Sequence, residues 1–302
     1  MGTLYQNSCL ACESKKIKDS ITLKDHSHTG EIFTVVQCCE CSFHFTQDVP
    51  DEQTIGPYYK GENYVSHSDT QKGVFFKIYH SVRNYMLKRK RNLICSQTEL
   101  NSGKLLDIGT GTGYFPNTMI QAGWEVEGIE KDEKTRNFAT SKFGFKVHDT
   151  PELYKLPPES FDAITMWHVL EHVHEIDDYL KKIFSILKPN GSFVVAVPNH
   201  MSYDQQHYKE FWAAWDIPIH LWHFNPSTMK KIMENYGFKI EKKVPMPFDG
   251  IYVSMLSEQY KSGSKIPGMF KGIVFALKGK INPDKCSSII YVMKKDAIKQ
   301  AY

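Results

Sequence analysis

The sequence has no long hydrophobic run, little net charge and no internal repeat. A membrane-spanning helix needs about 20 consecutive apolar residues, and no stretch of the 302 residues approaches that length. The net charge of +3 is too small to indicate a polyanionic partner by itself. The first residues lack a basic end followed by an apolar core, so we expect no secretion signal and a cytoplasmic protein. The remaining composition is that of a globular chain with one large domain and a small one.

Cysteine is scarce beyond residue 41, because five of the seven cysteines precede that point. Cys9 and Cys12 form one Cys-x-x-Cys pair, and Cys38 and Cys41 form a second. Two such pairs can complete a tetrahedral zinc site, and the metal could supply much of the folding energy of so short a segment. Residues 1–50 are therefore predicted to form a zinc-ribbon module, with short strands over 31–37 and 43–46.

Alternatives remain open within this module. Cys39 could replace Cys38, although only Cys38 keeps the two-residue spacer, and His44 is a substitute ligand. A disulfide is disfavoured in a cytosolic chain, and reduced buried cysteines without metal are the other alternative. Acids offset the lysines between Cys9 and Cys41, which argues against a phosphate-binding face and favours a structural role.

Residues 51–103 are interpreted as a linker and a lead-in helix. The loop over 51–64 is rich in Gly, Pro and acids, and apolar residues then recur at three- and four-residue steps from about 70 to 97. Four basic residues at 88–91 lie on this helix. We favour a solvated helix face near the carboxyl end over a contact with nucleic acid or membrane, because the cluster is short.

Residues 104–115 organise the rest of the chain. They predict a buried strand, a turn with Gly109, Gly111 and Gly113, and a helix that leaves free N–H donors behind the turn. A dinucleotide fingerprint would need its third glycine at position 114, which is Tyr114. The next predicted strand, 125–130, ends in the acid Glu130, which suits a ribose without a 2′-phosphate.

This pattern, with Asp107 ahead of the glycines and Glu130 at the next strand tip, resembles motif I of the class I S-adenosylmethionine (SAM) dependent methyltransferases. The resemblance covers about residues 9–245 and the final strand. It implies an α/β fold with a doubly wound, seven-stranded, mostly parallel sheet, preceded by the zinc ribbon. Residues 104–302 would form the methyltransferase domain, with helical and aromatic lid segments over 200–225 and 247–283.

The resemblance also implies the residues that bind SAM. Glu130 would accept the two ribose hydroxyls, and Trp167 and His168, at the end of the predicted strand 161–167, would border the methionine part. The full expected set is Asp107, Gly109, Thr110, Gly111, Gly113, Tyr114, Phe115, Glu130, Lys131, Asp149, Trp167 and His168.

Three later segments resemble the ubiquinone-type O-methyltransferases and zinc-bearing relatives. They are LEHV at 170–173, LKPNG at 187–191, and a W-x-x-x-D-x-P-x-H-L-x-H-F segment at 212–224. We expect residues 188–191 to end a helix ahead of a strand over 192–199. Ile219 stands where many relatives place Arg. We expect Glu171 and His172 to open a helix, and the aromatic residues of 200–225 to form an apolar acceptor pocket that excludes water.

The resulting prediction is an enzyme that transfers a methyl group from SAM to an oxygen, nitrogen or carbon atom of a small molecule, leaving S-adenosylhomocysteine. Catalysis would consist mostly of holding the nucleophile in line with the methyl carbon at about 3 Å. A hydroxyl or amine acceptor would need a base, for which His220 is the first candidate, with His168 and His223 behind it. The alternative role of His220 is to order its loop by hydrogen bonding.

Two other functions remain as alternatives. The first is an RNA or protein methyltransferase in which the ribbon binds the substrate, but the ribbon's weak charge argues against a nucleic-acid partner. The second is a non-catalytic SAM-binding scaffold, against which Asp107 and Glu130 both argue. The apolar, lysine-flanked stretches within 247–283 favour a helical lid or dimer patch, with a membrane-surface contact as the alternative. We expect a monomer or a homodimer.

Overall fold

The computed structural model describes residues 2–59 and 74–296. The chain divides into two compact units: one takes residues 1–64, 168–176 and 196–291, and the other takes 65–167, 177–195 and 292–302. This division differs from the boundaries expected at residues 50 and 103. Most of the linker after residue 59, and the expected helix start near residue 70, lie outside the described residues. Within the described part of the chain, no helix combines the length and the apolar character that crossing a bilayer requires.

The largest sheet has seven strands in the order β12-β13-β10-β9-β6-β7-β8. Strand β6 pairs in parallel with β7 and with β9, and β7 pairs in parallel with β8. Leu105, Leu106 and Ile108 of β6 are buried, as a strand covered on both faces requires. The expected doubly wound α/β sheet is confirmed. Its strands are β6 (Lys104–Ile108), β7 (Glu125–Ile129), β8 (Lys146–His148), β9 (Phe161–Trp167), β10 (Leu187–Pro198), β12 (Phe238–Pro245) and β13 (Ser288–Lys295).

Helices alternate with these strands, and their ends follow the capping residues. The Asp132 side chain accepts from the Thr135 backbone N–H at the start of α3, and Gly144 ends that helix with a left-handed φ of 74°. Asn225 caps α6 in the same way. The helices are α1 (Val74–Thr98), α2 (Tyr114–Ile120), α3 (Glu133–Phe143), α4 (Ile176–Ile186) and α6 (Pro226–Asn235).

Two expected boundaries are wrong. Glu171 and His172 do not open a helix: they lie in a single 3₁₀ turn, Leu170–His172, and α4 begins only at Ile176. The LKPNG segment does not separate a helix from a strand, because β10 already begins at Leu187. The Lys188 ammonium pairs with Asp162 at 2.9 Å beside strand β9, which holds this early part of β10 extended.

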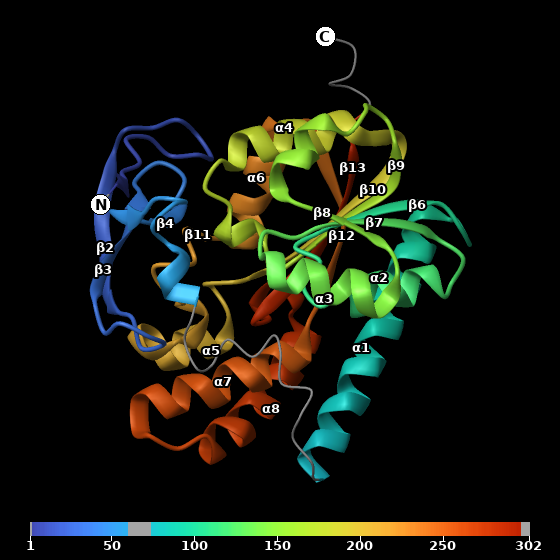
Figure 1. The fold of residues 1–302 in the computed structure, drawn as a ribbon. Coiled ribbons are helices and arrows are strands. Elements are labelled where there is room, and N and C mark those ends of the chain that lie inside the picture. The colour runs from blue at the N-terminus through green and yellow to red at the C-terminus, as the bar shows by residue number, and fades with distance from the viewer. Residues whose placement is uncertain (1, 60–73, 297–302) are drawn as a thin grey trace. The chain divides into compact units, whose positions relative to one another are not determined.

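The amino-terminal module is a sheet that a distant segment completes. Its four strands run in the order β11-β4-β3-β2 (Figure 1). Strand β11 places Trp222 opposite Phe45 and His223 opposite His44. Strand β2 was not expected, because only three of its eight residues are apolar. The strands are β2 (Ile17–Lys24), β3 (Ile32–Cys38), β4 (His44–Thr46) and β11 (Trp222–His223), and a short pair joins β1 (Thr3–Leu4) to β5 (Val49–Pro50).

The aromatic segment 200–225 folds against this sheet. It contains α5 (Tyr203–Tyr208) and two 3₁₀ turns, Lys209–Phe211 and Ala213–Trp215. Trp212 and Trp215 are buried in one cluster with Leu23 and Val35 of the ribbon strands. These tryptophans are therefore core residues, which anchor the segment to the amino-terminal sheet.

Residues 247–283 form a helical hairpin, as expected. Helices α7 (Pro247–Ser262) and α8 (Ile266–Ile281) lie side by side and are joined by a short turn in which Gly263 takes a left-handed φ of 77° (Figure 1). Pro247 and Pro267 stand in the first turns of the two helices, where a missing N–H costs nothing.

Candidate active site

The glycine turn after β6 has the backbone that only glycine adopts easily. Gly109, Gly111 and Gly113 have φ of 73°, 54° and 81°. A Cβ on Gly113 would stand 3.0 Å from the Ala139 Cβ, so this glycine allows the turn to pack on α3. A Cβ on Gly111 would meet nothing within 4 Å. Gly111 therefore faces open space, as a glycine that lets a ligand approach the backbone would.

Two acids stand beside this turn, as the sequence predicts. The buried Asp107 accepts a hydrogen bond from the Thr165 hydroxyl at 2.5 Å. Burial raises the pKa of Asp107 to about 7, against the opposing effects of Thr165 and the Lys90 charge. Glu130 accepts from the Gly111 N–H at 2.8 Å and from the Asp132 N–H at 3.0 Å. Each Glu130 oxygen keeps a lone pair for a further donor, such as a ribose hydroxyl.

A residue that the sequence analysis did not name ties the neighbouring strand tips together. One guanidinium nitrogen of Arg136 donates to the Glu130 and Lys131 carbonyls, at 2.8 and 2.6 Å, and to the Asp149 carboxylate at 3.1 Å. The expected residues Glu130, Lys131 and Asp149 are therefore neighbours in space. No local pattern distinguishes Arg136 from the other charged residues of α3, so it could not be singled out before the structure was known.

Aromatic side chains surround the other expected residues. Trp167, at the end of β9, meets Phe115 edge to face, with ring centroids 5.3 Å apart. The Lys90 ammonium lies 4.0 Å from the centre of the Trp167 ring. Tyr114 has Arg83 over its ring at 4.0 Å, and its hydroxyl accepts from Lys142 at 2.7 Å. The Thr110 hydroxyl donates to the Asp107 carbonyl at 2.8 Å, which closes the turn.

Four cysteines of the amino-terminal module converge, and their number and placement suit a metal. The sulfurs of Cys9, Cys12, Cys38 and Cys41 all lie within 4.8 Å of one another. Tetrahedral zinc bonds of about 2.3 Å would put the sulfurs about 3.8 Å apart, close to the 3.4 Å between Cys9 and Cys41. The buried Cys38 belongs to the cluster whereas Cys39 is exposed, so the sulfurs that converge are those of the register with the two-residue spacer. Burial raises the pKa of Cys38, but backbone N–H groups of Cys41 and Glu40 outweigh it and hold that pKa at about 7.

A second polar cluster lies where the Leu170–His172 turn meets the loop that follows Trp215. Ligand atoms of Glu171, His172 and His220 lie within 4.8 Å of one another. The Nδ1 atoms of both histidines contact backbone carbonyls. His172 Nδ1 lies 2.9 Å from the Ile219 carbonyl oxygen, and His220 Nδ1 lies 3.0 Å from the Ala214 carbonyl oxygen. A carbonyl can only accept, so each Nδ1 carries the proton and each Nε2 keeps a lone pair.

The Glu171 carboxylate makes this cluster deficient in hydrogen-bond donors. Its side chain is fully buried, and one of its oxygens, Oε1, has the His168 Nδ1 at the long distance of 3.4 Å. Within the described part of the chain, neither oxygen makes a hydrogen bond of good geometry. The two Nε2 lone pairs and this carboxylate are all acceptors, so the cluster could hold either a cation or the hydroxyl or amine hydrogens of a bound molecule.

His168 supplies positive charge beside Glu171. Its Nε2 lies 2.8 Å from an Asp249 oxygen, and its Nδ1 lies 3.4 Å from Glu171 Oε1. Burial lowers the pKa of His168, but the charges of Asp249 and Glu171 outweigh burial and raise it to about 10. A protonated imidazole cannot accept a proton, so His168 does not fit the role of a base. Asp249 lies in the first turn of α7, and no sequence pattern linked it to His168.

On the neighbouring histidines His172 and His220, burial also lowers the pKa, and there no nearby charge outweighs it. It lowers the pKa of His220, and it lowers the pKa of His172 to about 4, so both rings are neutral near pH 7. Burial also raises the pKa of Asp216 to about 6. An Asp216 oxygen lies 4.0 Å from His220 Nε2. The cluster thus combines a charged carboxylate with two neutral imidazoles that can accept protons.

His223, the third candidate base, has a structural role. The Thr46 hydroxyl gives its single hydrogen to the His220 carbonyl at 2.8 Å, so at 2.9 Å it must accept from His223 Nε2. The His223 ring also packs edge to face on Trp215, with centroids 4.8 Å apart. This hydrogen bond ties β11 to β4 and removes His223 Nε2 as a proton acceptor.

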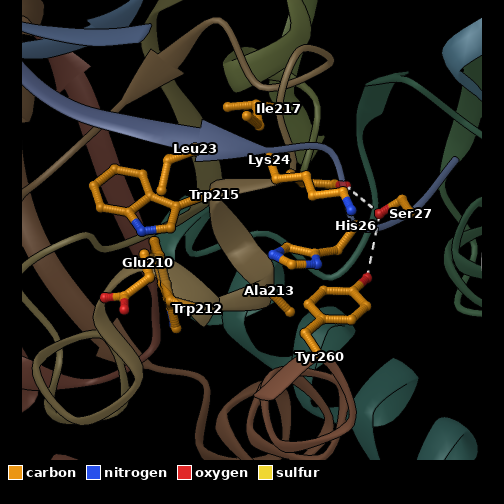
Figure 2. A pocket seen from close by; sticks show the side chains of 11 residues that line it. Leu23, Lys24, His26, Ser27, Glu210, Trp212, Ala213, Trp215, Ile217 and Tyr260 are labelled. Carbon is orange, nitrogen blue, oxygen red and sulfur yellow. Dashed lines mark hydrogen bonds between the residues drawn. The ribbon is translucent and has the colours of Figure 1, made fainter. Parts of the chain in front are cut away.

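Among the described residues, the cavity beside the aromatic segment does not have the size of the expected acceptor pocket. The cavity beside the aromatic segment has a volume of about 10 Å³, which admits about one water molecule (Figure 2). Figure 2 shows the Ser27 hydroxyl hydrogen-bonded to the Tyr260 hydroxyl and His26 stacked on the Tyr260 ring. The two hydroxyl oxygens lie 3.2 Å apart. Trp212 and Trp215 line the same cavity. Such a space is too small for an organic acceptor.

Comparisons with known proteins all match methyltransferases. A family model described as a methyltransferase domain matches residues 79–243. The chain is 26% identical to the mitochondrial ubiquinone biosynthesis O-methyltransferase of Homo sapiens over 200 residues, 58% of this chain and 54% of that protein. It is 34% identical to the ubiquinone biosynthesis O-methyltransferase of Pelagibacter ubique over 112 residues, 34% of this chain and 45% of that protein. The chain thus spans about half the length of these curated relatives.

Among solved structures, the chain is similar to a SAM-dependent methyltransferase from Archaeoglobus fulgidus. The two share 22% identity with a TM-score of 0.49, and the match covers 74% of this chain and all of that one.

Proposed function

The chain belongs to the class I family of SAM-dependent methyltransferases, and from that premise we propose that it transfers the SAM methyl group to a nucleophilic oxygen, nitrogen or carbon of a small molecule. The glycine turn, with open space at Gly111 and the Glu130 carboxylate beside it, supports the binding of SAM. SAM supplies an electrophilic methyl group. The nucleophile's electron pair forms the new bond to the methyl carbon, and the electron pair of the broken S–C bond stays on sulfur.

His220 is proposed as the base that takes the acceptor's proton. The observation that carries this role is the hydrogen bond between His220 Nδ1 and the Ala214 carbonyl, which leaves Nε2 with its lone pair. Burial keeps the imidazole neutral by lowering its pKa. Glu171 would stabilise the imidazolium that forms, as a buried carboxylate beside a catalytic histidine does. His172, held by the Ile219 carbonyl, would accept a second hydrogen bond from the acceptor.

The test begins with labelled SAM and a panel of sugar, quinone, lipid and polyketide acceptors. With the acceptor that turns over, His220→Ala should lower kcat by about 100-fold or more, the usual contribution of a general base, while SAM affinity in calorimetry stays unchanged. His207→Ala is the matched control, because His207 is an exposed histidine of α5 that touches none of these groups. Full activity of His220→Ala would reject the assignment.

Zinc is proposed as the resident metal of the four-cysteine cluster. Cys9, Cys12, Cys38 and Cys41 would bind it as thiolates and cross-link the two ends of the β2–β3 hairpin. The metal has no role in methyl transfer under this proposal, and its function is to stabilise the module.

A further inference from the structure

Helix α8 buries its small residues and exposes its large apolar ones, which is the reverse of the usual arrangement. Its small residues Gly268, Gly272, Ala276 and Gly279 are buried. A Cβ at Gly268 would stand 2.3 Å from Ser254 O, so there the α8 backbone lies directly against α7. The large apolar residues point the other way and are exposed: Ile266, Phe270, Ile273, Val274, Leu277 and Ile281, which we call the α8 outer face.

This outer face is a continuous stripe. At 3.6 residues per turn its six side chains fall within an arc of about 100°. The exposed fraction of Ile281 is 87%, that of Ile266 is 67% and that of Phe270 is 61%. Large apolar side chains that gather on one exposed helix face usually mark a contact with another molecule or a membrane.

The charged residues of α8 are all cationic. Lys271 and Lys278 follow one edge of the outer face, and Lys280 follows the other. The sixteen residues of α8 contain no acid. Lys271 pairs with Glu258 of α7 at 2.8 Å, whereas Lys278 and Lys280 are exposed. An apolar stripe bordered by lysines complements the acyl and headgroup layers of an anionic membrane.

We propose that the α8 outer face docks this protein onto an anionic lipid surface. The helix would lie in the plane of the interface, with Phe270 and Leu277 inserted among the acyl chains and the lysines at the phosphates. Its sixteen residues are too few to cross a bilayer, so the contact is peripheral. A second copy of the chain fits less well, because both edges of the stripe carry lysines and two stripes in contact would bring like charges together.

The experiment measures flotation of the full-length protein with two kinds of vesicle. One is phosphatidylcholine alone, and the other contains about one-third phosphatidylglycerol. We expect binding to the anionic vesicles that weakens as salt is raised. The double variant Phe270→Glu/Leu277→Glu should lose about tenfold or more of this binding, and Lys278→Glu/Lys280→Glu should lose the preference for anionic lipid.

The matched control is Ile32→Glu, because Ile32 is 70% exposed on strand β3 and lies far from α8 in the sequence. It should bind vesicles as the unaltered protein does, and circular dichroism of every variant should match. The proposal is overturned if the unaltered protein floats with neither vesicle, or if Phe270→Glu/Leu277→Glu binds normally. It is also overturned if light scattering shows a dimer that this double variant dissociates while neither protein floats. None of these readouts needs methyl transfer, so the result is independent of the proposed activity.

Discussion

At the scale of single residues, Glu130 beside the glycine turn is the proposed ligand of the SAM ribose. Its carboxylate already accepts the Gly111 and Asp132 N–H groups, so its position does not depend on a ligand. Glu130→Ala should weaken SAM binding about 10- to 100-fold, because a hydrogen bond to a charged group contributes about 1.5–3 kcal/mol. Calorimetry gives the affinity. Glu133→Ala, at an exposed acid of the next helix, should leave it unchanged, and equal affinities for both variants would contradict the ribose assignment.

A substitution at Gly111 can distinguish the effect of backbone strain from the effect of blocking the ligand. Gly111→Ala and Gly144→Ala both place an alanine at positive φ, and neither new Cβ meets an atom within 4 Å. Each should destabilise the protein by about 1 kcal/mol. Only Gly111→Ala should lower SAM affinity, by about tenfold or more, because its methyl group enters the space that the turn leaves open. Urea unfolding and calorimetry on the two variants test this, and equal SAM affinities would place the ligand elsewhere.

At the scale of elements, the zinc proposal concerns the two cysteine pairs that end β3 and precede β2. Elemental analysis of the anaerobically purified protein should find about one zinc per chain, and Cys38→Ser should reduce it well below that. Cys39→Ser is the control, because Cys39 is the exposed neighbour of the buried Cys38. The zinc proposal would be contradicted if Cys38→Ser kept about one zinc per chain, or if the unaltered protein contained none.

The element that joins the module to the later chain is β11. Its two residues pair with β4, and the Thr46 hydroxyl bridges the His220 carbonyl and His223. The loop that carries the proposed base is therefore fixed to the amino-terminal sheet by two kinds of hydrogen bond.

At the scale of the whole molecule, buried neutral histidines couple stability to pH. Burial lowers the pKa of His200 to about 3 from about 6.5 in the unfolded chain. Below pH 6.5 the His200 side chain therefore binds a proton in the unfolded chain but stays neutral in the folded one. The free energy of unfolding falls for this reason as the pH drops from 6.5 towards 3. His200→Gln keeps an acceptor for the Asn225 amide and removes the titrating ring.

The free energy of unfolding, measured in urea from pH 7 to pH 4, should fall more steeply for the unaltered protein than for His200→Gln, by about 3 kcal/mol over that interval. The comparison must be a difference between the two proteins, because the raised pKa values of the buried Asp107, Asp204 and Asp216 act in the opposite direction. Parallel pH dependences would show that His200 is not held neutral.

The sequence by itself determined the local features of this protein. Apolar strands, glycines that need positive φ, and two Cys-x-x-Cys pairs each leave a pattern within a few residues. The sheet was therefore predicted correctly, and the structure has positive φ at the glycines of 109–113 and brings the four predicted cysteines together. Only the tertiary structure decided that β11 completes the amino-terminal sheet, that the tryptophans of 212–215 form core, and that Asp249 lies against His168 and raises its pKa. These depend on contacts between segments tens to more than a hundred residues apart. Such contacts leave no periodicity in the sequence, and the protonation of a buried histidine is set by whichever carbonyl or carboxylate the fold places beside it.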